Sequence, residues 1–113
     1  MSQLIRLLGS IRAPLEDEKE TQRVIAEHLD AAGVGYRREV RLSEKDIVDF
    51  MIEGAAIEVK IKGSRANILR QLERYSAHAD VKQLILLTSR SVLLPRVIGG
   101  KPARAVSLSR AWL

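Results

Sequence analysis

Cysteine is absent from this chain of 113 residues, and aromatic side chains are scarce, with one Phe, one Trp and two Tyr. Without cysteine the chain can form no disulfide, no thiol nucleophile and no cysteine-ligated zinc site, so carboxylates and two histidines remain as side-chain ligands for a metal. The shortage of aromatic rings argues against base stacking as the main way of holding a nucleic acid.

Long apolar runs are also missing. No stretch approaches the roughly 18 consecutive apolar residues that a membrane-spanning helix needs, and the first residues lack the charged, apolar and small-residue order of a signal peptide. We therefore expect no membrane partner and a cytoplasmic location. The length predicts a single domain, residues 1–113, with room for one core.

Acidic residues are the smaller charged group, with 14 Asp and Glu against 19 Lys and Arg, which gives a net charge of +5. A basic surface favours a polyanionic partner such as DNA or RNA. No helix-turn-helix or zinc-finger pattern accompanies it, so we expect contacts to phosphates rather than sequence-specific reading of bases.

Residues 46–62 predict a hairpin of two apolar strands, 47–52 and 55–61, joined by a turn with Gly at its second position. If the turn has two residues, Ile52 faces Ala55, and counting back places Asp49 opposite Glu58. Lys60 follows on the same face because side chains on a strand alternate with a period of two.

Two carboxylates opposed across a strand pair repel each other by a few tenths to about 1 kcal/mol, and a divalent cation between them would remove that penalty. Asp49, Glu58 and Lys60 therefore predict a magnesium site. The alternative is a solvated strand face, because Glu-x-Lys by itself occurs by chance in many strands. Both interpretations stay open on these residues alone.

Residues 16–32 predict a helix, with acidic residues in the first turn and Gly33 at its end. Its expected buried stripe holds Val24, Ile25, Leu29 and Ala32. Glu18 falls on the same face, so it either points toward the site or serves only as a partner of the helix dipole. Glu20 is a rival for the first role.

The remaining elements are predicted from apolar periodicity and from glycine and proline. Strand 83–88 is apolar on both faces, so we expect it to be central and parallel to the strand that precedes helix 66–79. The amphipathic N-terminal segment offers more apolar surface than one small core needs, which predicts a homodimer. The other expected elements are a short helix within 1–14, a half-exposed strand 36–42, a loop 89–102, a strand 103–108 and a final turn from Ser109 to Leu113.

An aspartate ending one apolar strand, a short turn, and then apolar-Glu-Val-Lys in the next strand resemble the PD-(D/E)XK nuclease superfamily. The matching residues are Asp49, Glu58 and Lys60, and Val48 stands where the family name has proline. The resemblance implies an α/β, restriction-endonuclease-like fold, with an αβββαβ core, a mixed central sheet and flanking helices over about residues 16–108. It also implies dependence on Mg²⁺, with Mn²⁺ able to substitute.

Glu18 and Gln22 ahead of the apolar stripe resemble the first helix of VRR-Nuc members, which are small single-domain nucleases similar to Holliday-junction resolvases. This implies that Glu18 joins Asp49, Glu58 and the backbone carbonyl of Val59 in binding the metal. Gln71 followed by Tyr75 resembles a helix of RecB-like members, in which the glutamine supports the site and the helix approaches DNA.

The activity implied is that of a metal-dependent DNA endonuclease that selects DNA structure, such as a branch, rather than sequence. Lys60 would orient or help deprotonate the attacking water, with Gln71 in support. A catalytically silent nucleic-acid-binding module and an RNA-directed nuclease of the same fold are the alternatives. The expected nucleic-acid contacts are Arg37, Arg38, Lys62, Arg65, Arg74 and Tyr75.

Overall fold

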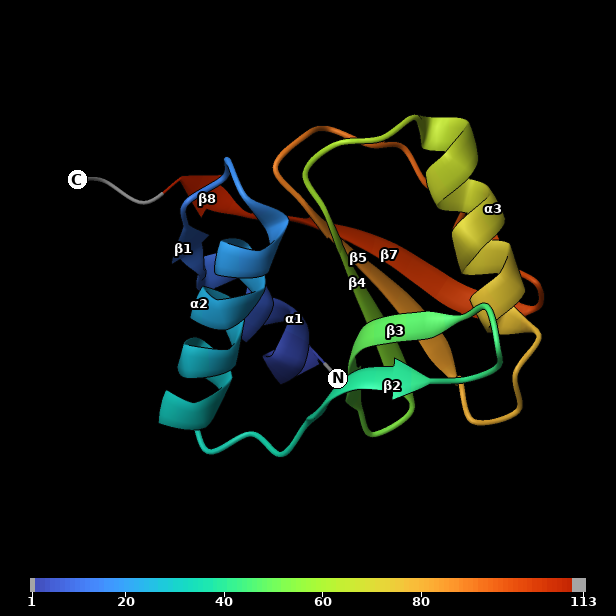
Figure 1. The fold of residues 1–113 in the computed structure, drawn as a ribbon, viewed down its shortest axis with the longest axis horizontal. Coiled ribbons are helices and arrows are strands. Elements are labelled where there is room, and N and C mark those ends of the chain that lie inside the picture. The colour runs from blue at the N-terminus through green and yellow to red at the C-terminus, as the bar shows by residue number, and fades with distance from the viewer. Residues whose placement is uncertain (1, 111–113) are drawn as a thin grey trace.

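A computed structural model describes residues 2–110, in which a six-stranded mixed sheet of order β2-β3-β4-β5-β7-β6 is covered by helices on both faces (Figure 1). The expected α/β class is confirmed. The elements, in chain order, are α1 (Ser2–Ser10), β1 (Arg12–Ala13), α2 (Glu18–Ala31), β2 (Arg37–Arg41), β3 (Ile47–Ile52), β4 (Ala55–Lys60), α3 (Arg65–Ser76), β5 (Gln83–Thr88), β6 (Val97–Ile98), β7 (Lys101–Ser107) and β8 (Ser109–Arg110).

The strand pairings agree with the predicted hairpin and the predicted crossover. Ile52 pairs with Ala55 across the antiparallel β3–β4 turn, as expected from a two-residue connection. The connection from β4 to β5 runs through α3, and β5 lies between β4 and β7 and is parallel to both. The apolar run of β5 is therefore buried on both of its faces.

The two faces of the sheet bury separate apolar clusters. On one face α1 and α2 pack Leu8, Ile25 and Leu29 against sheet residues that include Phe50 and Ile57. On the other face α3 packs Ile68, Leu72 and Tyr75 against Val48, Met51 and Leu86. No helix within residues 2–110 is long and apolar enough to cross a membrane.

The first long helix, α2, begins and ends close to the predicted bounds. The Asp17 side chain caps it by accepting the N–H of Lys19, and Gly33 follows its end with a φ of 70°. Ile25 and Leu29 are fully buried and Val24 is half-buried, as the stripe predicts. Ala32 is exposed instead, because it is the C-cap residue, where the chain leaves the face that covers the sheet.

Three other predicted bounds differ from the structure. Helix α3 ends at Ser76 rather than Ala79, because the chain must turn to bury Val81 beneath it. The predicted loop 89–102 contains β6, which forms a hairpin with β7 through Gly99 and Gly100, both at positive φ. The predicted final turn begins as strand β8, paired in parallel with β1, and its residues 111–113 lie outside the described part of the chain.

The N-terminal segment forms the predicted short helix, but its apolar side chains pack inside the same chain. Leu8 and Ile11 are fully buried, and Leu4, Ile5 and Leu7 pack against the same cluster. The surplus of apolar surface on which the homodimer prediction rested is therefore not found here. The oligomeric state itself stays a prediction.

Candidate active site

The β3–β4 ladder stops one step short of the two predicted carboxylates. The last paired residues are Phe50 and Ile57, so the register places Asp49 next to Glu58 as predicted. The two residues are linked by hydrogen bonds from backbone N–H groups to side-chain carboxylates, instead of by the backbone-to-backbone bonds of a regular ladder. The N–H of Asp49 donates to Oε1 of Glu58 at 3.3 Å, and the N–H of Val59 donates to Oδ2 of Asp49 at 2.8 Å. Each carboxylate thus occupies the place of a backbone carbonyl at the point where the strands part.

The other neighbour of Asp49, strand β2, is irregular at the same level. Its ladder with β3 pairs Arg38 with Phe50 and Val40 with Val48, and it omits the intervening step at Glu39. Glu39 has a φ of 50°, a left-handed conformation that is uncommon outside glycine. The backbone distortion of the sheet is therefore concentrated around Asp49, and distortion of this kind is often retained at functional sites.

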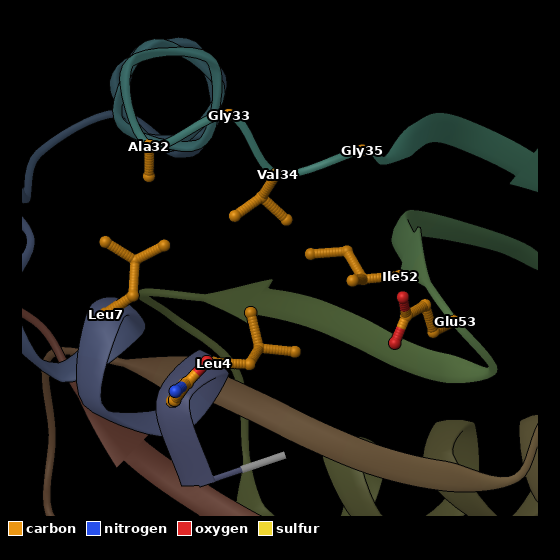
Figure 2. A pocket seen from close by; sticks show the side chains of 9 residues that line it. Leu4, Leu7, Ala32, Gly33, Val34, Gly35, Ile52 and Glu53 are labelled. Atoms are coloured by element: carbon orange, nitrogen blue, oxygen red, sulfur yellow. The ribbon is translucent and has the colours of Figure 1, made fainter.

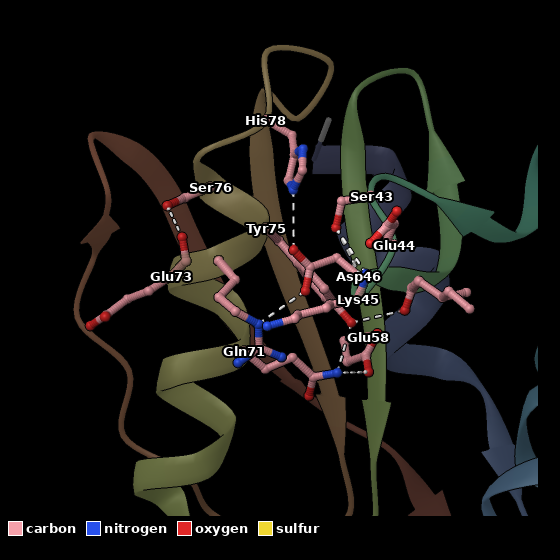
Figure 3. Close-up of polar contacts among 12 residues, drawn as sticks. Ser43, Glu44, Lys45, Asp46, Glu58, Gln71, Glu73, Tyr75, Ser76 and His78 are labelled. Atoms are coloured by element: carbon pink, nitrogen blue, oxygen red, sulfur yellow. Dashed lines mark hydrogen bonds and ion pairs between the residues drawn. The ribbon is translucent and has the colours of Figure 1, made fainter.

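Glu58 is buried under α3, with 4% of its surface exposed. Its Oε2 accepts a hydrogen bond from Nε2 of Gln71 at 3.0 Å (Figure 3). The same oxygen lies 3.7 Å from Nζ of Lys60. Burial, and then the charge of Asp49, raise the pKa of Glu58 to about 8, against an ordinary value of 4.5. A carboxylate with this pKa is poised to give up its proton near neutral pH.

The carboxylate of Asp49 is also desolvated. Burial raises its pKa, while the Val59 N–H and the charge of Lys60 act in the opposite direction and Glu18 adds to the increase. The contribution of Glu18 reflects its position, because its Oε1 accepts the N–H of Ile61, just beyond β4, at 3.1 Å. Helix α2 therefore delivers Glu18 to the strand that carries Glu58.

The rival carboxylate on α2, Glu20, is engaged elsewhere. It accepts hydrogen bonds from Arg23 one turn later on the same exposed helix face, and that hydrogen bonding lowers the pKa of Glu20. The geometry selects Glu18 over Glu20 as the helix carboxylate nearest the site.

The prediction that Tyr75 contacts a nucleic acid is wrong. Its side chain is 1% exposed, its hydroxyl donates to the carbonyl of Ile47 at 2.9 Å, and it accepts from Nε2 of Gln71 at 2.7 Å. Burial, followed by the charge of Glu58, raises the pKa of Tyr75 well above its usual range. Tyr75 thus ties α3 to the start of β3 and helps to fix Gln71, which in turn holds Glu58.

Arg74 is committed to an ion pair that sequence reasoning missed. Its Nε donates to Oδ1 of Asp46 at 3.0 Å. Nε2 of His78 lies 3.2 Å from Oδ2 of the same carboxylate (Figure 3). Asp46 is 6% exposed. Burial alone would raise the pKa of Asp46, but the hydrogen bonds from Arg74 and His78 lower it below its usual value. The four-residue spacing of Arg74 and His78 within the predicted helix 66–79 was a visible signal, whereas the distant Asp46 was not.

Arg37 and Arg38, both predicted to contact nucleic acid, lie on opposite faces of the sheet, because neighbours on a strand point to opposite faces. The Arg38 guanidinium lies 5.3 Å from the Phe50 ring centroid, and its Nη2 donates to Gln22 of α2 at 3.4 Å. Arg37 lines a cavity of about 190 Å³ with His78 on the α3 side. Lys62 and Arg65 are exposed and follow the end of β4. Lys60 is the last residue of that strand, and Glu18 bonds to Ile61 directly after it.

A cavity of about 650 Å³ lies away from the carboxylates, between α1, the end of α2 and the β3–β4 turn (Figure 2). Leu4, Leu7, Val34 and Ile52 point into it, and Glu53 stands at its side. None of Asp49, Glu58 and Lys60 lines it. The candidate site is therefore the parting of β3 and β4 rather than this cavity.

The donor set at that parting consists of carboxylates, which suit a hard cation such as Mg²⁺. Among residues 2–110, no three side chains of His, Cys, Asp or Glu converge into a ready-made metal site. A cation held by Asp49 and Glu58 would therefore keep several water ligands, as Mg²⁺ commonly does. Comparison of the chain with protein-family models, with curated proteins and with solved structures found no match.

Proposed function

We propose that this protein is a Mg²⁺-dependent nuclease with a restriction-endonuclease-like core, hydrolysing phosphodiester bonds in DNA and selecting DNA structure rather than sequence. The observation that carries the proposal is the reciprocal lock of Asp49 and Glu58 at the parting of two strands, with the Lys60 ammonium 3.7 Å from the Glu58 carboxylate. Two desolvated carboxylates beside a lysine form an unfavourable arrangement in a purely structural protein.

The order of elements from α2 to β5 is compatible with such a core, since one helix and three antiparallel-connected strands precede the crossover helix α3. The net charge of +5 supports a polyanionic substrate. The absence of a base-reading module in the sequence supports selection by structure rather than by sequence.

The residues present fit a magnesium ion. Asp49 and Glu58 would hold it, with the carbonyl of Val59 and, through water, Glu18. Bound Mg²⁺ would lower the pKa of a coordinated water and stabilise charge on the leaving oxygen. Burial, and then the charge of Asp49, raise the pKa of Glu58 to about 8, and a bound cation would offset that negative charge.

Within this scheme Lys60 acts on the water and the phosphate. Its ammonium stands beside Glu58 on the same strand face, where it can orient the attacking water and balance charge on the phosphate. Gln71 is a positioning residue, because its amide donates to Oε2 of Glu58 and is itself held by Tyr75.

A second candidate is a silent nucleic-acid-binding module. It is favoured by the lack of three converging ligands among residues 2–110 and by the fact that both carboxylates already accept backbone N–H groups. On this alternative the carboxylates only terminate the β3–β4 ladder. A cation would then leave the stability of the protein unchanged.

The test is incubation of the purified protein with linear, nicked, single-stranded and four-way-junction DNA, and with RNA, in Mg²⁺ or Mn²⁺. We expect cleavage of at least one DNA form, and its loss in Asp49→Asn and Lys60→Ala. Glu20→Gln is the matched control, because Glu20 pairs with Arg23 on the exposed face of α2. Cleavage that persists in Asp49→Asn, or that is absent from every DNA form, would refute the proposal, and cleavage of RNA alone would change its substrate.

A further inference from the structure

The connection between β5 and β6, residues 89–96, presents an exposed leucine in a fixed position. Leu93 is 82% exposed. Its neighbours Val92 and Leu94 are half-buried and pack against the cluster under α3. Since both flanking side chains point inward, the one between them is held outward.

Two arginines hold this loop in place, Arg65 from α3 and Arg90 from the loop itself, and each keeps some of its N–H donors free. Nε of Arg65 donates to the carbonyl of Leu93 at 2.8 Å, and Nη2 of Arg90 donates to the carbonyl of Gly63 at 2.5 Å. A guanidinium has five N–H donors in a rigid fork, and these bonds use one nitrogen of each. The remaining donors are oriented before a ligand arrives, which lowers the entropy cost of binding.

These residues surround a cavity of about 310 Å³, and no acidic side chain within the described residues 2–110 lines it. Its wall is made by Arg65, Arg90, Ser91, Val92 and Leu93. Positive charge at one side and apolar surface at the other suit a ligand that has an anionic group next to a flat apolar group. A nucleotide, with its phosphate and its base, has this combination.

We propose that residues 89–96 with Arg65 form a contact for unpaired nucleic acid, in which Leu93 packs against an unstacked base and Arg65 and Arg90 hold the adjacent phosphates. Apolar side chains such as leucine are used in this way to separate stacked bases. The inference rests on the proposed function for its substrate, and it narrows that substrate to DNA with unpaired or easily unstacked bases.

The contact is tied to the segment that follows β4, the strand that carries Glu58 and Lys60. Gly63, which Arg90 holds, follows Lys60 by three residues, so their separation is at most about 11 Å. Successive phosphates on one strand of a duplex are about 3.4 Å apart along the axis, so this distance corresponds to about three nucleotides. Figure 1 shows the β5–β6 connection beside the segment that joins β4 to α3. One strand could therefore engage both places.

The experiment measures binding without cleavage, in EDTA, by fluorescence anisotropy of labelled single-stranded DNA, of a duplex with an internal mismatch bubble, and of a perfect duplex. A 2-aminopurine base in the bubble reports unstacking. Burial of one leucine predicts that Leu93→Ala weakens binding of the single strand and the bubble by about tenfold or more, with little change for the perfect duplex. The rise in 2-aminopurine emission should disappear in the same variant.

Two control substitutions remove the same kind of side chain at a position outside the proposed contact. Val97→Ala is the control for Leu93→Ala, and Arg6→Ala is the control for Arg90→Ala. Val97→Ala removes another exposed apolar side chain, 58% exposed on β6 and outside the cavity, and should leave binding unchanged. Arg6→Ala removes one positive charge from α1 and should act less on the bubble than Arg90→Ala does. Arg90→Lys, which keeps the charge but not the fork, should recover only part of the affinity.

Equal loss of affinity for bubble and perfect duplex in Leu93→Ala, or no loss for either, overturns the inference. Failure of the unmutated protein to bind any of the three DNA forms also overturns it. The proposed function is separable: cleavage that depends on Asp49 but not on Leu93 rejects this contact alone. Binding that depends on Leu93 without cleavage in any metal retains the contact and rejects the nuclease.

Discussion

Asp49 and Glu58 are joined by a hydrogen bond from the backbone N–H of one to the carboxylate of the other, at 3.3 Å, instead of by backbone bonds of a regular ladder. The two carboxylates are therefore fixed by main-chain donors before any ligand binds. Burial at this place raises the pKa of each carboxyl group, and the charge of Asp49 raises that of Glu58 further.

The first prediction concerns stability against pH. The pKa of Glu58 is about 8 in the folded protein against 4.5 ordinarily, so the folded state binds a proton that the unfolded state has lost between those values. The resulting stabilisation is complete below about pH 4.5 and disappears as pH rises through about 8. We expect the free energy of unfolding in EDTA to fall across this range by on the order of a few kcal/mol.

Urea denaturation at a series of pH values measures this slope. Glu58→Gln should flatten it and should be the more stable protein at pH 8, because the glutamine carries no charge to desolvate. Asp46, whose pKa is lowered, contributes in the opposite sense only at more acidic pH, below its ordinary value of 3.8. An unchanged slope in Glu58→Gln would show that another group is responsible.

The position of these two carboxylates was predictable because it follows from local rules. Glu53 and Gly54 specify a short turn, the turn sets the register at Ile52 and Ala55, and the register brings Asp49 to Glu58. The parting of the strands was not predictable in this way. It depends on side-chain carboxylates outcompeting the ladder for N–H groups, which spacing alone does not reveal.

On α3, too, one feature could be predicted from the sequence and another could not. Tyr75 follows Ile68 and Leu72 at the helical interval of the buried stripe, so its burial could have been predicted from periodicity. The partner of Arg74 could not. Asp46 lies in the turn before β3, and only the fold brings it to the end of α3.

The second prediction is that a divalent cation stabilises the folded protein. Mg²⁺, or Ca²⁺ as a non-catalytic probe, should raise the melting temperature, since a ligand of the native state alone stabilises by mass action. The effect should be larger at pH 8 than at pH 6, because the cation competes with the proton on Glu58. Asp49→Asn and Glu58→Gln should lose most of this shift.

Lys60→Ala is the informative contrast in that measurement, because lysine is not a ligand in the proposed scheme. It should keep the cation-induced shift in melting temperature while losing cleavage. If neither ion changes the melting curve of the unmutated protein, the better interpretation is the silent module, in which Asp49 and Glu58 only terminate the β3–β4 ladder.

The third prediction assigns Arg74 to stability rather than to nucleic-acid binding. Arg74→Ala leaves the buried Asp46 carboxylate with one fewer donor, which should cost about 1–3 kcal/mol in the free energy of unfolding. Arg70→Ala is the matched control on the same helix, because Arg70 is exposed and, among the residues that the structure describes, bonds only to the exposed Asn67. Its effect should stay within about 0.5 kcal/mol. Equal effects of the two changes would argue against the Asp46 ion pair.

The last prediction concerns which positive charges contact phosphates. Lys62 is exposed two residues beyond Lys60, at the end of the strand that carries Glu58, and it forms no ion pair with any residue that the structure describes. If DNA lies across this end of the sheet, affinity should fall steeply with salt, and Lys62→Ala should reduce the slope of log K against log salt by about 1. The charge of Arg74 is already paired with Asp46, so Arg74→Ala should leave the slope unchanged although it lowers stability. Anisotropy titrations of one DNA over a range of salt concentrations measure both slopes. A salt-independent affinity, or a slope that responds to Arg74 and not to Lys62, would place the DNA on a different face of the protein.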